Sequence, residues 1–132
     1  MKIYESAEDY LETILILSMQ KPQVRSIDIA NHMNFSKPSV SVAMKNLRQA
    51  GYIQVSSEGF ITLLPPGLEI ATQIYERHTI LTRFLMSLGV DEETAAEDAC
   101  KLEHHISAKS FAALKEHAEK YHFANTPEVP VS

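Results

Sequence analysis

The sequence predicts a mainly α-helical fold with a small β-hairpin, in which an N-terminal winged helix-turn-helix precedes a C-terminal helical domain. Apolar residues recur at helical spacing along most of the 132 residues, and residues 52–64 alternate β-branched and aromatic side chains around a glycine turn. The charge is divided as well. Between Thr13 and Ser57 stand five basic residues and a single acid, although the chain as a whole has a net charge of −5. This asymmetry favours a basic nucleic-acid-binding module joined to an acidic module, against the plainer alternative of a mixed solvated surface.

The first two predicted helices are short and separated by a break. The first begins with a capping-box-like run at residues 6–9, continues with apolar residues at helical spacing, and is broken at residues 21–22. Ser26 is expected to cap the second helix, Ile27–Met33. A tight turn follows at residues 34–35.

The third helix and the hairpin complete the N-terminal module. Ser36 caps this helix, Pro38 is tolerated in its first turn, and Gly51 stops it. Residues 52–56 and 60–64 then form the two strands of the hairpin. Helix, short helix, tight turn, helix and hairpin is the order of a winged helix-turn-helix, whose second helix of the pair enters the major groove of DNA.

Three further helices are predicted after the prolines at residues 65–66. The first is Leu68–Ser87. The second has the acids at 91–93 at its start and includes the run Ala95–Ser107, and the third is Ala108–Tyr121 with Ser107 as its cap. We therefore expect a DNA-binding domain at 1–65, a helical domain at 66–122 and a flexible tail at 123–132.

Composition excludes several classes of protein. No apolar run approaches the roughly 18 residues of a membrane span, and the N-terminus lacks the pattern of a signal peptide. The single cysteine rules out an internal disulfide framework. These observations favour a cytoplasmic protein with no membrane partner.

Candidate DNA contacts lie on the third helix and at the start of the second. The N-terminal half of the third helix has mostly small side chains, which let the backbone approach DNA, and its lysines can reach phosphates. An alternative is a winged helix used for protein contacts, but the local positive charge favours DNA. The predicted contacts are Arg25, Ser36, Lys37, Pro38, Ser39, Ser41, Val42 and Lys45.

A candidate metal site is indicated by Cys100, Glu103 and His104, which share one face if they lie on a helix. A thiolate, a carboxylate and an imidazole on one face are suitable ligands for a divalent transition metal. Asp9 and Glu12 are likewise three residues apart on the first helix. Each residue alone has an ordinary structural explanation, such as a capping acid, a solvated charge or a small buried thiol.

The order of these motifs resembles the diphtheria toxin repressor and manganese transport regulator family of metal-dependent bacterial repressors. The resemblance covers about residues 4–120 and rests on Ala7-Glu-Asp-Tyr-Leu-Glu12, the helix-turn-helix, Glu76-Arg-His78 and Cys100-Lys-Leu-Glu-His-His105. It implies that the C-terminal domain binds metal. The apolar faces of Leu68–Leu88 and Ala95–Leu114 lack enough partners in so small a chain, which predicts that they pair in a homodimer. The resemblance also implies six metal ligands, which are Asp9, Glu12, His78, Cys100, Glu103 and His104.

The sequence departs from both branches of the family it resembles. The manganese branch normally has Glu where this chain has Cys100, and the iron-responsive branch has that Cys but usually Met in place of Asp9. The second, anion-assisted site of the iron branch is also missing residues, since Thr79, Thr82 and Ala96 stand where that branch has Arg, Glu and His. The expected cofactor is Fe(II) or Mn(II), with Co(II), Ni(II) or Zn(II) as substitutes.

Three functions are compared. The first is a metal-activated repressor of metal uptake or homeostasis genes that binds a palindromic operator in double-stranded DNA as a homodimer, with no small-molecule substrate. The second is a winged-helix regulator that senses a small molecule or redox state through Cys100 without stoichiometric metal. The third, a small metalloenzyme, is disfavoured because no dedicated nucleophile and no general base outside the ligand set is evident.

Overall fold

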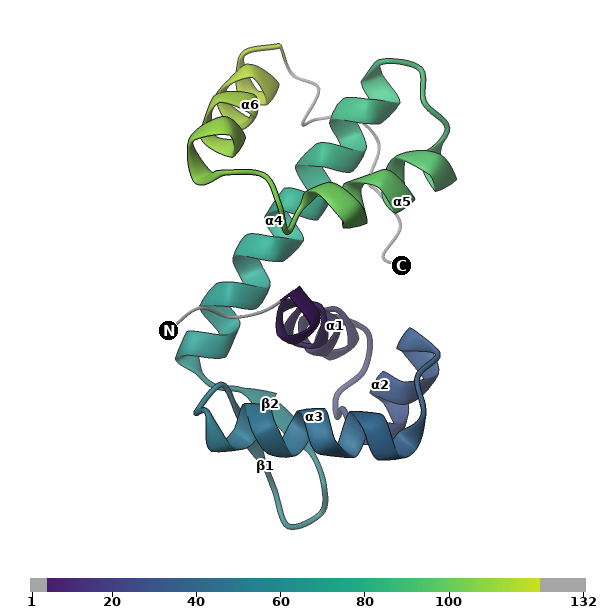
Figure 1. Ribbon diagram of the computed structural model, residues 1–132, viewed down its shortest axis with the longest axis vertical. Coiled ribbons are helices and arrows are strands. Elements are labelled where there is room, and N and C mark those ends of the chain that lie inside the picture. Colours follow the sequence, from purple (N-terminus) through teal and green to yellow (C-terminus); the bar gives the residue numbers. More distant parts are fainter. Residues whose placement is uncertain (1–4, 122–132) are drawn as a thin grey trace. The chain divides into compact units, whose positions relative to one another are not determined.

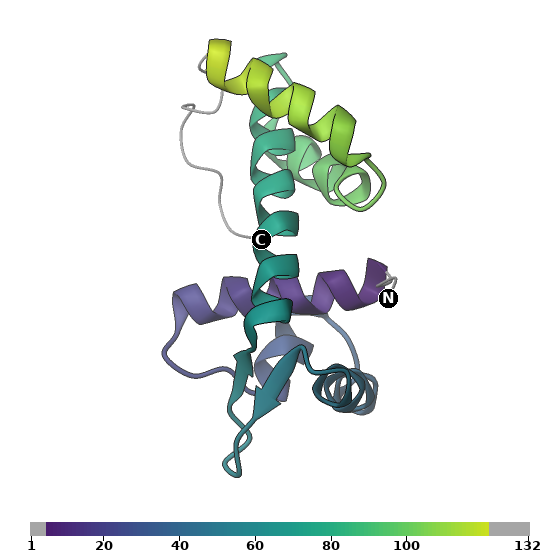
Figure 2. The same ribbon diagram turned by 90° about the vertical axis from the view of Figure 1, so that its left-hand side faces the viewer.

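The computed structural model describes residues 5–121, which form six helices and one two-stranded antiparallel sheet (Figures 1 and 2). The chain divides between Gln73 and Ile74, within a continuous helix, into two compact units. In chain order the elements are α1 (Glu5–Gln20), α2 (Ser26–Met33), α3 (Lys37–Gln49), β1 (Ile53–Val55), β2 (Ile61–Leu63), α4 (Pro65–Ser87), α5 (Glu92–Leu102) and α6 (Ala108–Tyr121).

The first unit is a three-helix cluster with the hairpin beside it. Helices α1, α2 and α3 share a core that includes Leu11, Ile14, Ile29 and Val40, each with no exposed surface. Strands β1 and β2 pair so that Gln54 lies opposite Thr62. The observed order of elements confirms the predicted winged helix-turn-helix.

The turn between α2 and α3 is built as predicted. Asn34 adopts a left-handed conformation with φ of 58°, which asparagine tolerates better than most residues. Ser36 then caps α3, since its side-chain oxygen accepts a hydrogen bond from the Ser39 amide at 3.3 Å. The short connection fixes the angle at which α3 follows α2.

Several predicted boundaries are wrong. Ser6 lies inside α1, and Ser26 is the first residue of α2, whose N-cap is Arg25. The Asp28 carboxylate accepts a hydrogen bond from the Arg25 amide at 2.9 Å, so an acid in the first turn, and not a serine hydroxyl, satisfies an amide at the start of this helix. Helix α4 begins at Pro65 and not at Leu68, because prolines fit the first helical turn, where their missing amide hydrogen is not needed.

The second unit packs α5 and α6 against the C-terminal part of α4 (Figures 1 and 2). Its core contains Ile80, Phe111 and Ala118, with Phe84 and Leu114 packed against them. Gly89 ends the turn after α4 with φ of 99°, and Ser107 caps α6 through the Ser110 amide at 3.0 Å. Both were predicted from the sequence.

No helix within residues 5–121 is both long enough and apolar enough to cross a membrane. The predicted tail at 123–132 lies outside the described residues.

Candidate metal centre and nucleic-acid interface

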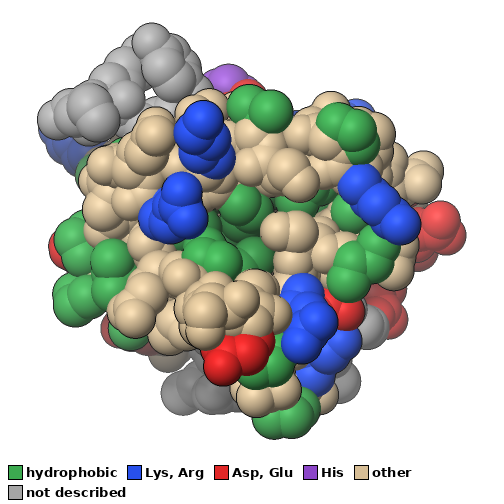
Figure 3. Space-filling model, turned by 90° about the horizontal axis from the view of Figure 1, so that it is seen from below, with side chains coloured by type: hydrophobic (Ala, Val, Ile, Leu, Met, Phe, Trp, Pro, Cys, Tyr) green, Lys and Arg blue, Asp and Glu red, His purple; other side chains and the backbone are tan. Residues whose placement is uncertain are grey.

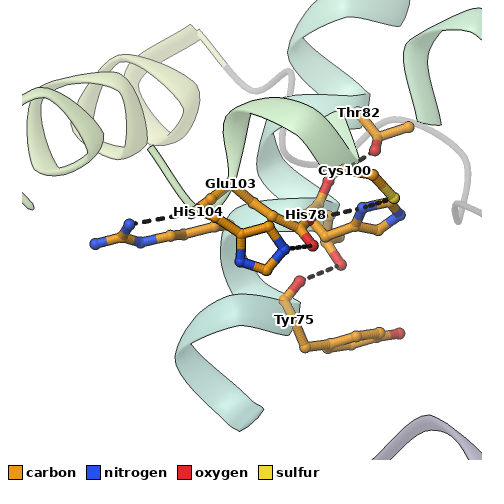
Figure 4. A network of polar contacts seen from close by, with 8 residues as sticks. Tyr75, His78, Thr82, Cys100, Glu103 and His104 are labelled. Atoms are coloured by element: carbon orange, nitrogen blue, oxygen red, sulfur yellow. Dashed lines mark hydrogen bonds and ion pairs between the residues drawn. The ribbon is translucent and has the colours of Figure 1, made fainter. Parts of the chain in front are cut away.

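His78 is the buried centre of a polar cluster in the second unit (Figure 4). It lies midway along α4 and is 5 % exposed. One turn further along α4, the Thr82 hydroxyl donates a hydrogen bond to the His78 carbonyl at 2.7 Å. The imidazole is therefore held on a rigid helix and faces the end of α5.

Two potential ligands from the end of α5 approach the same ring nitrogen of His78. The Glu103 carboxylate oxygen Oε2 lies 2.9 Å from His78 Nδ1, and the Cys100 Sγ lies 3.7 Å from it. Ligand atoms of these three residues all lie within 4.8 Å of one another. Glu103 has no exposed surface, whereas Cys100 is an exposed residue. The three side chains converge from two helices, as Figure 4 shows.

His104 is the fourth potential ligand of this unit. Its Nε2 lies 3.4 Å from Glu103 Oε1, and its side chain is 2 % exposed. The prediction that it lies on a helix is wrong, because α5 ends at Leu102 and His104 belongs to the turn that follows. Glu103 is the C-cap and keeps helical backbone angles, so Cys100 and Glu103 still share a face.

The geometry of these donors fits a divalent metal ion. Neighbouring ligands bonded to one ion at roughly 2.0–2.3 Å lie about 2.8–3.8 Å apart in octahedral or tetrahedral geometry. The separations of 2.9 Å and 3.7 Å from His78 Nδ1 lie within that range. Without a metal, the contact with Glu103 is a hydrogen bond between a buried ring and a buried carboxylate, and both groups are already in place.

Asp9 and Glu12 belong to the first unit. Both lie on α1 with the spacing of three residues that puts them on one face of a helix. Asp9 is half-buried and Glu12 is 8 % exposed. Their participation in the metal site stays a prediction.

The predicted DNA contacts are all exposed in the first unit. Val42 is 60 % exposed on α3, an unusual exposure for an apolar side chain. Ser36 and Ser39 are joined at the N-terminus of α3 by a hydrogen bond of 2.8 Å between their hydroxyls, so both contribute to the cap. The face seen in Figure 3 carries scattered Lys and Arg side chains with neutral and apolar ones between them, together with some Asp or Glu side chains.

The hairpin is attached to the helix-turn-helix by backbone and side-chain contacts. The Ile61 amide donates to the Val24 carbonyl at 2.7 Å, and the Arg25 guanidinium lies 4.6 Å from the centre of the Phe60 ring. At the hairpin tip, the backbone amide of Glu58 and the hydroxyls of Ser56 and Ser57 lower the pKa of the Glu58 carboxyl. The hairpin tip therefore carries a negative charge that interacts with the positive charge of Arg25.

One residue of the cluster was not predicted from the sequence. Arg77, next to His78, donates through Nη1 to the carbonyl oxygens of Glu103 at 3.1 Å and Ile106 at 2.9 Å. These acceptors are 26 and 29 residues away, so no local spacing signals the contact.

Family models match nearly the whole chain. The model described as "Iron dependent repressor, N-terminal DNA binding domain" matches residues 2–59, and "Iron dependent repressor, metal binding and dimerisation domain" matches residues 65–127.

Two curated relatives are 36% identical to this chain. One is the transcriptional regulator MntR of Salmonella typhimurium, over 110 residues that cover 83% of this chain and 70% of the relative. The other is an uncharacterized HTH-type transcriptional regulator of Methanocaldococcus jannaschii, over 119 residues that cover 89% and 95%.

Solved structures of manganese regulators superpose on most of this chain. The manganese regulator SloR superposes with a TM-score of 0.73 at 26% identity, over 93% of this chain and 55% of that one. The apo form of the manganese-activated repressor ScaR gives 0.71 at 27% identity, over 84% and 53%. The chain thus spans about half the length of these two structures.

Proposed function

Because the chain belongs to the iron-dependent repressor family of metal-dependent, DNA-binding transcriptional regulators, we propose that it represses genes of metal uptake or homeostasis when Fe(II) or Mn(II) is bound. The observation that supports the proposal is the convergence of His78, Cys100 and Glu103 in a chain whose predicted DNA contacts on α3 are exposed. No catalytic step forms part of the proposal.

The proposed ligands come from three helices and one turn. His78 on α4, Cys100 and Glu103 at the end of α5, and His104 in the next turn supply four donors. Asp9 and Glu12 on α1 supply two more carboxylates, as the family resemblance implies. Six donors with three carboxylates suit Fe(II) or Mn(II), and the thiolate raises the relative affinity for softer ions such as Co(II) and Zn(II).

The charges of these residues explain why metal and DNA binding would be coupled. If Asp9 and Glu12 join Glu103 in the site, as the family resemblance implies, the three carboxylates would repel one another without a counter-charge. These residues would hold a divalent ion, which would supply that counter-charge. If the conformation that binds DNA also binds metal better, linkage requires that each ligand strengthens the binding of the other.

A homodimer and a palindromic operator complete the proposal. A helix-turn-helix dimer reads two half-sites about one helical turn of DNA apart, or a multiple of it. The name of the matching C-terminal model includes dimerisation, which supports two copies of this chain as the binding unit.

The first test combines elemental analysis with selection of DNA sequences. Protein purified without oxygen should retain close to one or two equivalents of Fe, Mn or another divalent metal per chain. Duplexes selected from a random pool in Mn(II) should converge on an inverted repeat, and the same selection with a chelator should not. Metal-free protein that selects the same repeat, or responds to oxidation of Cys100 alone, would favour the competing redox sensor.

A further inference from the structure

The turn that carries Glu103 and His104 lies just beyond the end of α5, outside regular helical structure. The amides of His105 and Ile106 both bond to the Leu102 carbonyl at 3.0 Å. The carbonyls of a helix C-terminus and of the turn after it have no helical amide partners, so other groups must satisfy them. The conformation of this turn decides where two of the proposed ligands point.

Arg77 supplies that missing partner. A single terminal nitrogen, Nη1, donates to the Glu103 carbonyl at 3.1 Å and to the Ile106 carbonyl at 2.9 Å, so it bridges both ends of the turn. The guanidinium also lies 5.5 Å from the centre of the Phe111 ring on α6, and Phe111 is 8 % exposed. The planar group thus contacts an aromatic ring as well as two carbonyls.

Arg77 and His78 are neighbours in the sequence and both contact Glu103. Arg77 directly precedes His78, whose Nδ1 faces the Glu103 carboxylate. One residue of α4 therefore faces the Glu103 side chain while its neighbour holds the Glu103 backbone. The two contacts therefore hold both the side chain and the backbone of Glu103.

The geometry points to Arg77 as a positioning residue that holds the Glu103–Ile106 turn in the conformation that binds metal. Arg77 does not itself bind metal; it acts through the backbone of Glu103 and through the Phe111 ring. This inference rests on the proposed metal site, and it adds a residue outside the ligand set. Changes to groups that orient metal ligands typically weaken metal binding about 10–100-fold.

A matched control is available on the same two helices. Glu76 and Lys115 form a surface ion pair of 2.9 Å that also joins α4 to α6, and their side chains are 42 % and 43 % exposed. Lys115→Met removes a cationic link between α4 and α6 without touching the turn. It separates general docking of α6 from positioning of Glu103.

The test measures the turn without metal and then the site with Co(II) as the probe. In metal-free Arg77→Met, amide hydrogen exchange at His105 and Ile106 should be at least about tenfold faster, because the turn opens more often. The dissociation constant for Co(II) should rise by about 10–100-fold, and the thiolate-to-cobalt absorption band should change. Arg77→Lys keeps the charge but loses the planar group, so its exchange rates and its dissociation constant for Co(II) should lie between those of wild type and Arg77→Met. If Arg77→Met does not fold, Arg77→Lys is the variant that tests the inference.

Two outcomes would overturn the inference. One is that Arg77→Met has the amide exchange rates and the Co(II) affinity of the wild type. If Arg77→Met does not fold, the same result in Arg77→Lys would overturn the inference. The other is an equal effect in Lys115→Met, which would assign the role to the packing of α6. If the wild-type protein does not bind Co(II), the proposed metal site fails, and the exchange rates of metal-free protein still show whether Arg77 holds the turn.

Discussion

At the scale of single residues, Cys100 is the side chain that distinguishes this site from one built only of oxygen and nitrogen donors. Its sulfur lies 3.7 Å from His78 Nδ1. Cys100→Glu should shift metal preference toward Mn(II) by roughly tenfold or more, because a carboxylate is a harder donor than a thiolate. Competition between Mn(II) and Co(II) measures the shift.

A control for this variant lies on the same helix. Thr94→Glu adds the same charge at an exposed position in the first turn of α5, away from the donors. It should leave the preference unchanged. If Cys100→Glu also has the selectivity of the wild type, Cys100 is not a ligand.

Glu58 is the second residue whose charge has a testable consequence. Hydrogen bonds from its own amide and from two serines lower its pKa, so it is ionised at neutral pH at the hairpin tip. Glu58→Gln should strengthen binding to DNA at low salt because it removes a repulsion from phosphates, and the gain should vanish at high salt. Salt titrations of duplex binding, with Glu69→Gln on α4 as control, check this. A gain in affinity that persists at high salt would show that Glu58 does not act through repulsion of the DNA phosphates.

The residue types of the site could be predicted from the sequence, but their support could not. Cys100 and Glu103 were predicted from their spacing on a helix and His78 from the family resemblance, and the second unit brings the three together. Arg77 was missed because its hydrogen bonds go to backbone carbonyls, which every residue has and no motif marks.

At the scale of elements, the start of α2 depends on one acidic side chain. The Asp28 carboxylate accepts hydrogen bonds from Lys21 Nζ at 2.6 Å and from the Arg25 amide at 2.9 Å, and the bond from Lys21 is the main reason its pKa is lowered. The lowered pKa means that Asp28 stabilises the fold fully above its ordinary pKa of 3.8 and loses this effect as pH falls through the lower folded value.

Asp28→Asn should therefore lower the free energy of unfolding by about 0.3–1 kcal/mol at neutral pH, because it removes the charge that strengthens the bonds from Lys21 and from the Arg25 amide. The difference from wild type should shrink below pH 4, which urea unfolding at several pH values measures. A difference that grows at acid pH would contradict the assigned sign.

The junction between β1 and α4 requires a glycine. A Cβ atom at Gly67 would overlap the carbonyl oxygen of Tyr52, which accepts a hydrogen bond from the Leu64 amide at 3.0 Å. Gly67→Ala should cost about 1–3 kcal/mol, as overpacking does, although alanine is normally the better helix former. Thermal unfolding measures this loss of stability. A Gly67→Ala variant more stable than the wild type would show that the backbone at Tyr52 can shift to accommodate the Cβ atom.

Element boundaries were harder to predict than the elements themselves. The run Ala95–Ser107 has helical composition, yet α5 ends at Leu102, and the carbonyls of Glu103 and Ile106 beyond it accept hydrogen bonds from Arg77, which is far away in sequence. Pro65 and Pro66 mark a boundary, but they begin α4 instead of preceding it.

At the scale of the whole molecule, the order of elements was enough to predict the fold class. Each helix of the first unit has its own cap or break signal, and the hairpin has a glycine turn with φ of 86° at Gly59. The two family models and the superposed structures confirm this fold. The convergence of α4 and α5 on one site depends on tertiary packing, which spacing along the chain does not contain.

The most direct measurement of the central claim is fluorescence anisotropy of a selected operator duplex, with Mn(II) or Fe(II) and with a chelator. Metal should tighten binding by about 5–150-fold, the usual range of coupling between two sites. His104→Ala should remove this effect, whereas His117→Ala, an exposed histidine on α6 with no assigned role, should keep it. Equal affinity with metal, with chelator and in both variants would contradict a metal-dependent switch.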